Sequence, residues 1–230
     1  WSFLTPVFML AVYTFVFSVV FNARWSTANE SKMEFALVLF AGLIVFNLFS
    51  ECVNRAPSLI LSNVNYVKKV VFPLEILPIV AFGSAFFHML ASLFVWLLCY
   101  AIFFGMPSAS ALLLPLILLP LALIVVGLSS ILASMGVYLR DVSQLVGTLT
   151  TALMFLSPIF YPASALPLEY QKVLVINPLF PIIEQVRGVL MKGEMPDLYF
   201  LGSYILFSAF FAWIGFALFQ KTRKGFADVL

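Results

Sequence analysis

Charged residues are scarce in this chain of 230 residues: Asp, Glu, Lys and Arg together make up 10% of it. Soluble domains carry about 25% charged residues, so the composition excludes an ordinary soluble protein. The longest stretch without such a residue is 76–139, where His88 is the only ionisable side chain apart from tyrosine and cysteine. With 63% hydrophobic residues and a mean hydropathy of +1.12, the chain is expected to be an integral membrane protein.

Motifs for metal, nucleotide and nucleic-acid binding are also lacking. Cys52 and Cys99 are the only cysteines and His88 is the only histidine, which leaves no disulfide framework and no metal-ligand set. No G-x-x-x-x-G-K-[ST] or G-x-G-x-x-G motif occurs, so we expect no ATP hydrolysis by the chain itself, no cofactor and no catalytic residues. A net charge of +2 without long Lys/Arg runs argues against nucleic acid.

What the chain does contain is a series of long apolar stretches. A hydrocarbon core of about 30 Å requires about 20 helical residues, so residues 76–139 must cross it twice, with a hairpin at Gly105–Ser110. Spanning segments of this kind are helical because helices satisfy their own backbone groups in lipid. The sequence predicts an all-α protein with six transmembrane helices, at residues 3–21, 34–51, 77–104, 111–137, 142–161 and 198–220.

Lysine and arginine are distributed unevenly over the connectors. If both termini are cytoplasmic, the inner segments 52–76, 138–141 and 221–230 hold seven of these residues, and the short outer segments hold two. The long outer segment 162–197 adds three more. The positive-inside rule favours a multi-pass protein with both termini in the cytoplasm.

The inner connector, residues 52–76, is too regular to be a plain loop. Its apolar residues recur at helical spacing after the Pro57-Ser58 pair. The pattern predicts a short amphipathic helix along the inner membrane surface. Such a helix is either an interfacial anchor or a docking element for a soluble partner.

The long outer connector contains two apolar stretches, 166–176 and 181–191, that are too short to span a membrane. Pro167 and Pro181 suit the first turns of helices, and Asn177–Pro178 breaks the chain between them. This pattern predicts a re-entrant pair of half-helices that dips into the outer leaflet.

Three ionisable residues in or near these segments have two interpretations each. Glu184 and Arg187, three residues apart, form either a local ion pair or a contact of an outer gate. His88 lies mid-span among small residues and serves either helix packing or proton transfer. No acidic residue lies in the interior of any span as a partner for it, which disfavours proton-coupled transport.

Two spans carry stripes in which polar and aromatic residues alternate. Hydrogen bonding between helices is one explanation for such polar residues in a membrane. The other is a route for a solute with both hydroxyl groups and apolar faces, such as a sugar. The stripes consist of Tyr13, Thr14, Phe17, Ser18 and Phe21 in the first span, and of Gln144, Thr148, Thr151 and Phe155 in the fifth.

Six segments, in this order along the chain, together resemble a known family. They are WSFLTP at 1–6, VKKVVFPLEILP at 67–78, YLRD at 138–141, SPIFYP at 157–162 with ALP at 165–167, INPLFPIIE at 176–184 and KGFADVL at 224–230. The chain resembles the permease subunit of type-2 ABC exporters, in the branch that exports O-antigen, capsule and teichoic-acid polysaccharides.

The resemblance implies a single transmembrane domain over residues 1–230, which dimerises and pairs with two copies of a separate ATPase that binds the ATP. The channel lies between the two permease copies in the bacterial inner membrane. The family's amphipathic interface helix would precede Trp1 and is missing from this sequence. The coupling helix maps onto residues 55–69, with Arg55, Asn63, Lys68 and Lys69, and the gate helices map onto 166–191. The expected outer gate consists of Pro158 and Tyr161, which precede these helices, and of Asn177, Pro178, Pro181, Glu184 and Arg187.

The implied function is ATP-driven export of a lipid-linked polysaccharide along the stripes of the first and fifth spans. One alternative is a type-2 permease for a small lipophilic drug or another lipid-linked substrate. A membrane enzyme is the other. It would need a catalytic cluster, and the outer carboxylates show no catalytic spacing; they are Glu169, Glu184, Glu194 and Asp197.

Overall fold

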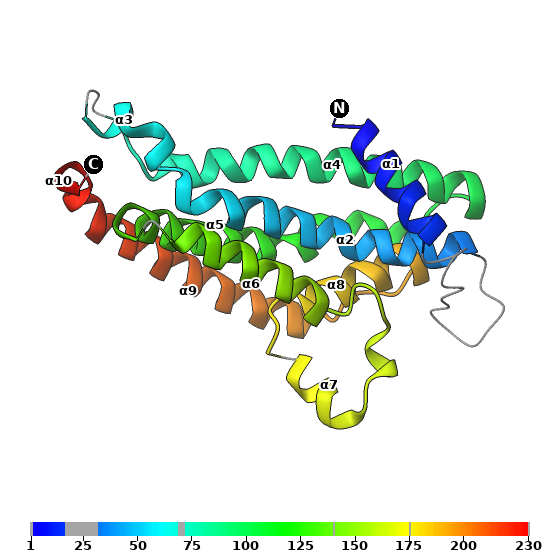
Figure 1. The fold of residues 1–230 in the computed structure, drawn as a ribbon. Helices are drawn as coiled ribbons and strands as arrows, with labels where there is room; N and C mark the ends of the chain where they lie inside the picture. The colour runs from blue at the N-terminus through cyan, green and yellow to red at the C-terminus, as the bar shows by residue number, and fades with distance from the viewer. Residues whose placement is uncertain (1, 17–31, 69–71, 140, 175, 230) are drawn as a thin grey trace. The chain divides into compact units, whose positions relative to one another are not determined.

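The computed structural model describes residues 2–16, 32–68, 72–139, 141–174 and 176–229, and every regular element in this part of the chain is a helix (Figure 1). The all-α prediction is therefore confirmed. The α-helices are α1 (Leu4–Tyr13), α2 (Lys32–Arg55), α3 (Val64–Lys68), α4 (Ile76–Phe104), α5 (Leu114–Tyr138), α6 (Val142–Leu156), α7 (Leu168–Leu174), α8 (Phe180–Arg187), α9 (Leu198–Thr222) and α10 (Phe226–Val229).

Among the described residues, four helices are long and apolar enough to cross a membrane, namely α2, α4, α5 and α9. Two shorter apolar helices, Leu4–Val16 and Val142–Leu156, coincide with the first and fifth predicted spans. The 15 residues of α6 rise only about 22 Å, less than the thickness of a hydrocarbon core. The prediction that this helix reaches residue 161 was wrong: it ends at Leu156 because Pro158 disfavours a helical Ser157.

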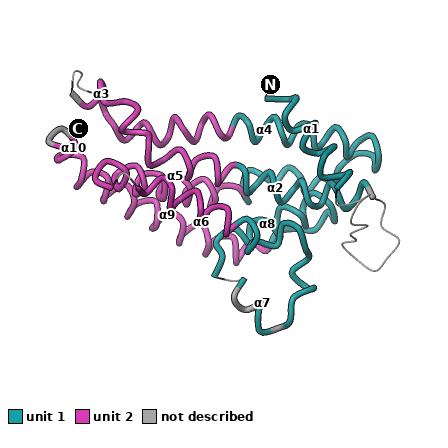
Figure 2. Tube along the Cα trace, in the orientation of Figure 1, with its two compact units in different colours: residues 1–47, 87–117, 154–196 teal, residues 48–86, 118–153, 197–230 magenta. Residues whose placement is uncertain are grey.

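The chain forms two compact units, which Figure 2 distinguishes by colour. Unit 1 comprises residues 1–47, 87–117 and 154–196, and unit 2 comprises 48–86, 118–153 and 197–230. Because α2, α4 and α5 each contribute residues to both units, the boundary is not a linker. The single domain inferred from the sequence stays a prediction.

Unit 1 is organised around the first half of α2. Residues 35–41 of this helix are all buried, which fits a helix that is apolar on every side. The fully buried Trp96 of α4 donates its indole N–H to the carbonyl of Leu37, 2.8 Å away. This bond satisfies the one polar atom of a large buried ring and joins α4 to α2.

Unit 2 has a core that joins distant parts of the sequence. Ile60 and Leu74 of the inner connector pack with Ala133 of α5, Phe219 of α9 and Phe226 of α10. The two phenylalanine rings meet edge to face at 5.6 Å. The connector is therefore a packed part of the fold and not a loose loop.

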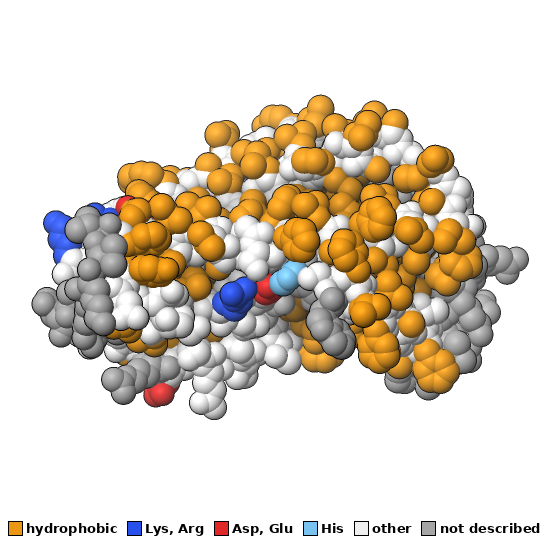
Figure 3. Space-filling view, turned by 90° about the horizontal axis from the view of Figure 1, so that it is seen from above, with side chains coloured by type: hydrophobic (Ala, Val, Ile, Leu, Met, Phe, Trp, Pro, Cys, Tyr) orange, Lys and Arg blue, Asp and Glu red, His pale blue; other side chains and the backbone are white. Residues whose placement is uncertain are grey.

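Large hydrophobic side chains cover much of the surface, as the face in Figure 3 shows in orange. On α9, Leu206 is 74% exposed and Trp213 is 63% exposed. A soluble monomer rarely exposes so much contiguous apolar area, whereas lipid contact accounts for it.

Candidate functional site

The polar and aromatic stripe of α6 lies on the exposed face of that helix. Gln144, Thr148 and Thr151 are exposed, and Phe155 is 61% exposed. The opposite face, with Val142, Val146 and Thr150, is buried. The predicted face of α6 is thus available to a ligand, while its role in lining a channel stays a prediction.

The stripe threonines donate their hydroxyl protons to their own helices. The Oγ1 atom of Thr148 donates to the carbonyl of Gln144 at 3.1 Å, and that of Thr151 donates to the carbonyl of Gly147 at 2.9 Å. In the first stripe, the hydroxyl of Thr14 likewise donates to the carbonyl of Leu10, at 2.7 Å. Each hydroxyl oxygen therefore keeps lone pairs that can accept further hydrogen bonds, which suits a ligand rich in hydroxyl donors.

The stripe of the first span is described only in part. Tyr13 and Thr14 are half-buried. Phe17, Ser18 and Phe21 lie outside the described residues, so their predicted position stays a prediction.

The inner connector is helical, as the sequence predicts, but it consists of several short pieces instead of one helix. It consists of two 3-10 turns, Ala56–Ser58 and Leu61–Asn63, followed by the five residues of α3. Ser62 donates its hydroxyl to the carbonyl of Ser58 at 2.6 Å, and Asn63 donates its amide to the carbonyl of Leu59 at 2.8 Å. Side chains of this type compete with a regular helix for backbone acceptors.

The predicted coupling residues lie in different environments. Arg55 is exposed and forms an ion pair with Glu51 at 3.5 Å, whereas Asn63 is half-buried. The side chain of Lys68 and all of Lys69 lie outside the described residues. The exposed surface of the connector also includes residues that were not predicted from the sequence, namely Ser58, Leu61, Ser62, Asn65 and Tyr66.

The end of the chain holds the inner connector in place through a polar network that sequence reasoning missed. Glu75, directly before α4, accepts hydrogen bonds from Arg223 at 2.8 Å and from Gln220 at 3.1 Å. Burial raises the pKa of the Glu75 carboxyl, but hydrogen bonds from the backbone, Gln220 and Arg223 outweigh it, so the pKa lies below its usual value. The signal in the sequence is a lone acidic residue between two apolar runs.

A close backbone approach reinforces this arrangement. Gly136 of α5 lies against the carbonyl of Pro57, where any added Cβ would collide with that oxygen. The hydroxyl of Tyr138 donates to the carbonyl of Thr222 at 3.0 Å. The connector, α5 and the end of α9 are therefore held together by apolar and polar contacts.

The outer segment contains the two short helices that the sequence predicts, α7 and α8, and Pro181 lies in the first turn of α8. Asn177 separates them: its side-chain oxygen accepts from the N–H of Leu179 at 2.9 Å, and its amide donates to the hydroxyl of Ser157 at 2.8 Å. Pro178 and Pro181 are half-buried. Asn177–Pro178 thus breaks the helix as expected.

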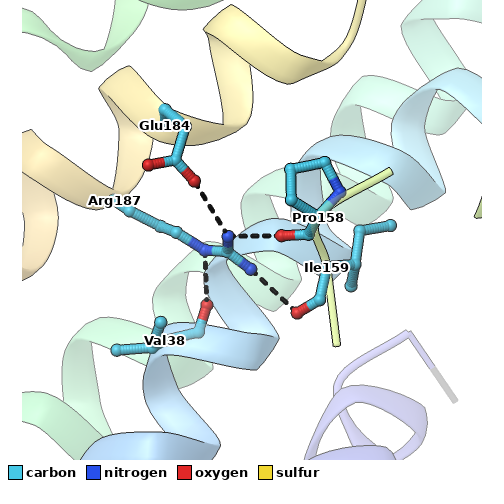
Figure 4. Close-up of polar contacts among 5 residues, drawn as sticks. All are labelled: Val38, Pro158, Ile159, Glu184 and Arg187. Atoms are coloured by element: carbon cyan, nitrogen blue, oxygen red, sulfur yellow. Dashed lines mark hydrogen bonds and ion pairs between the residues drawn. The ribbon is translucent and has the colours of Figure 1, made fainter. Parts of the chain in front are cut away.

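Arg187, at the end of α8, is buried among carbonyl oxygens (Figure 4). Only 4% of the residue is exposed. Its guanidinium donates to the carbonyls of Val38 at 3.0 Å, Pro158 at 2.5 Å and Ile159 at 2.9 Å. It also approaches the carboxylate of Glu184 at 3.3 Å, so the predicted ion pair is confirmed.

The three carbonyl partners of Arg187 were not foreseen from the sequence. Burial lowers the pKa of the guanidinium to about 10 while Glu184 acts in the opposite direction, so the group stays protonated at neutral pH. Tyr161, nearby, donates its hydroxyl to the carbonyl of Phe155 at 3.4 Å. The structure brings Pro158, Glu184 and Arg187 into one cluster.

Three of the four outer carboxylates named above have structural partners. Asp197 caps the first turn of α9 by accepting from two backbone N–H groups, Glu184 pairs with Arg187, and Glu194 pairs with Lys192 at 3.7 Å. Among the described residues, no three His, Cys, Asp or Glu side chains are placed to hold a metal ion.

Comparison with known proteins identifies relatives along the whole chain. The model of the ABC-2 type transporter family matches residues 1–191. The O-antigen export system permease protein RfbA of Myxococcus xanthus is 26% identical over 230 residues, which covers 99% of this chain and 86% of the relative. RfbA of Klebsiella pneumoniae is 25% identical over 236 residues, which covers 100% of this chain and 86% of the relative. The polysialic acid transport protein KpsM of Escherichia coli is 24% identical over 227 residues, which covers 97% of this chain and 85% of the relative.

Proposed function

Because this chain belongs to the ABC-2 type transporter family, we propose that it is the membrane subunit of an ATP-driven exporter that moves a lipid-linked, O-antigen-like polysaccharide out of the cytoplasm. The observation that carries the proposal is the similarity, over nearly the whole chain, to permeases named for O-antigen export and polysialic acid transport. It is a transporter subunit and not an enzyme. The names of these relatives favour a polysaccharide over a small lipophilic drug.

The proposed topology has six spans, formed by α1, α2, α4, α5, α6 and α9, with both termini in the cytoplasm of a bacterial cell. Four of these helices have the length and composition for a complete crossing. The distribution of lysine and arginine supports the orientation. In this arrangement α7 and α8 belong to the outer side as a re-entrant pair.

The proposed channel lies between two copies of the chain and is lined by the stripes of the first span and of α6. Exposed Gln144, Thr148, Thr151 and Phe155 support this role because they combine hydrogen-bond acceptors with an aromatic ring. Many weak ring and hydroxyl contacts suit a polymer that must slide past without stopping.

The partner is a separate ABC ATPase, present in two copies, which binds and hydrolyses the ATP. We place its docking surface on the inner connector, with Arg55, Asn63, Lys68 and Lys69. The firm packing of this connector on the core of unit 2 supports a mechanical role, because a loose loop could not transmit a displacement. The outer gate is proposed to include Pro158, Tyr161, Asn177, Pro178, Pro181, Glu184 and Arg187.

The test compares two phenylalanines of equal exposure. Phe155 of the stripe is 61% exposed and Phe210 of α9 is 60% exposed. We expect Phe155→Ala to reduce surface polysaccharide severalfold in a strain that lacks the native gene, while the chain still co-purifies with its ATPase. Phe210→Ala is the matched control and should export normally. Normal export by Phe155→Ala would refute the lining assignment. ATP hydrolysis by the wild-type complex that lipid-linked glycan does not stimulate would refute the proposed substrate.

A further inference from the structure

We propose that Arg187 is a positioning residue, which holds the turn that follows the stripe of α6 at a fixed place on α2. This turn, Ser157–Pro162, is called the exit turn below. The inference rests on the proposed function, because it concerns the end of the helix that would line the channel. It refines the gate assignment for two members: Arg187 would serve the gate by fixing the exit turn, and its contact with Glu184 would not be required for export.

The first argument is the number and kind of partners. A buried carbonyl without a hydrogen bond is costly, and the carbonyls of Pro158 and Ile159 lie beyond the end of α6, outside its own backbone hydrogen bonds. The guanidinium satisfies both, at 2.5 and 2.9 Å, while its Nε atom reaches the carbonyl of Val38 on α2. One planar cation with five donors thus joins the exit turn to α2.

The second argument is the shape of α2 at this place. Gly42 lies one helical turn after Val38, and a Cβ at Gly42 would lie 2.6 Å from the Nη2 atom of Arg187. The space for the guanidinium therefore depends on a glycine. The carbonyl of Val38 can accept from Arg187 in addition to its helical partner because a carbonyl oxygen has two lone pairs.

The third argument is the minor part that Glu184 has in the cluster. Its side chain is 44% exposed, and its distance to Arg187, 3.3 Å, is longer than those of the three carbonyl bonds named above. An ion pair with one solvent-exposed partner contributes little. The three carbonyl bonds, all buried, are therefore the main constraint on Arg187.

The exit turn determines where the aromatic end of the stripe lies. Phe155 and Phe160 flank its start, with ring centroids 5.9 Å apart, and the hydroxyl of Tyr161 donates back to the carbonyl of Phe155. If the turn leaves α2, these rings lose their common position. Arg187 would then affect export without contacting the polymer.

The experiment uses the full chain with its ATPase in proteoliposomes, supplied with lipid-linked glycan extracted from cells that make it but lack the exporter. It compares Arg187→Lys, Gly42→Ala and Glu184→Gln. Gly83→Ala is the matched control, because an added Cβ on this helical glycine would have no atom within 4 Å beyond the adjacent residues and backbone of its own helix. The readouts are protein yield, basal ATP hydrolysis, and glycan exported per ATP hydrolysed.

We expect Arg187→Lys and Gly42→Ala to lower the export per ATP at least fivefold with basal hydrolysis unchanged, because a lysine cannot reach three carbonyls and the alanine displaces the guanidinium. Glu184→Gln and Gly83→Ala should stay within twofold of wild type. The inference is overturned if Glu184→Gln matches Arg187→Lys, if Gly42→Ala matches Gly83→Ala, or if both test variants fail to accumulate. Absence of glycan-stimulated hydrolysis in the wild type would instead refute the proposed function.

Discussion

Removal of the Phe226 ring is a direct test of how the inner connector is supported. Phe226 lies in α10, is fully buried, and packs against Phe219 and Tyr138. The four residues of α10 cannot form a stable helix alone, since isolated helices need about 12–15 residues. The segment after α9 therefore depends on this ring.

The magnitude follows from the burial. Truncation of a buried phenylalanine to alanine costs about 3–5 kcal/mol, which combines lost apolar contact with the cavity that remains. Each 1.4 kcal/mol corresponds to a factor of ten, so local opening should become about 100-fold or more easier. We expect Phe226→Ala to raise the amide hydrogen-exchange rates of residues 223–229 by this factor, and to raise those of the adjacent connector residues 56–67 to a smaller extent.

The measurement is hydrogen exchange by mass spectrometry on the purified complex in lipid nanodiscs. Val229→Ala is the matched control, because Val229 lies in the same short helix and is 49% exposed. If Phe226→Ala exchanges within threefold of the control in both segments, the proposed support of the connector is refuted. Reduced stimulation of the partner ATPase should accompany the increased exchange.

Three further predictions concern other contacts. The pKa of Glu75 lies below its usual value, so its carboxylate stabilises the fold above about pH 4.3. This contribution is lost as the pH falls through the lowered pKa. Glu75→Gln should remove that part of the pH dependence of thermal unfolding. Trp96→Phe loses a buried hydrogen bond and should lower stability by about 1–2 kcal/mol, whereas Trp213→Phe, at a 63% exposed position, should not. The double variant Thr148→Val, Thr151→Val should lower polysaccharide export, and the corresponding serine variants should keep it.

Each of these predictions has a contradicting result. An unchanged pH profile in Glu75→Gln would show that the carboxylate is not stabilised in the folded state. Equal melting temperatures for the two tryptophan variants would show that the buried hydrogen bond of Trp96 does not stabilise the protein. Full export by the double valine variant would exclude the threonine oxygens as ligand contacts.

Much of the helical order was predictable because lipid imposes a simple rule. Residues 76–139 contain too little charge and too many apolar residues for anything but two long helices, and the structure has α4 and α5 there with the turn that begins at Gly105. Pro181 likewise marked the start of α8, since proline is tolerated in a first helical turn. These are local effects of composition and backbone sterics.

The predictions that failed depended on competition between local forces. The inner connector has the apolar spacing of one helix, yet Ser62 and Asn63 take up backbone carbonyls and break it into shorter turns. The helix α6 stops at Leu156 although the apolar run continues, because of Pro158. Neither effect can be predicted from hydropathy alone.

By itself, the sequence determined that the protein is helical and lies in a membrane, because long uncharged segments can satisfy their backbone groups there only as helices. It also determined which face of α6 is polar, since spacing along a helix defines a face. Only the tertiary structure decided what surrounds Arg187. Two of its three carbonyl partners are 28 and 29 residues away and the third is 149 residues away, and backbone carbonyls carry no mark in a sequence.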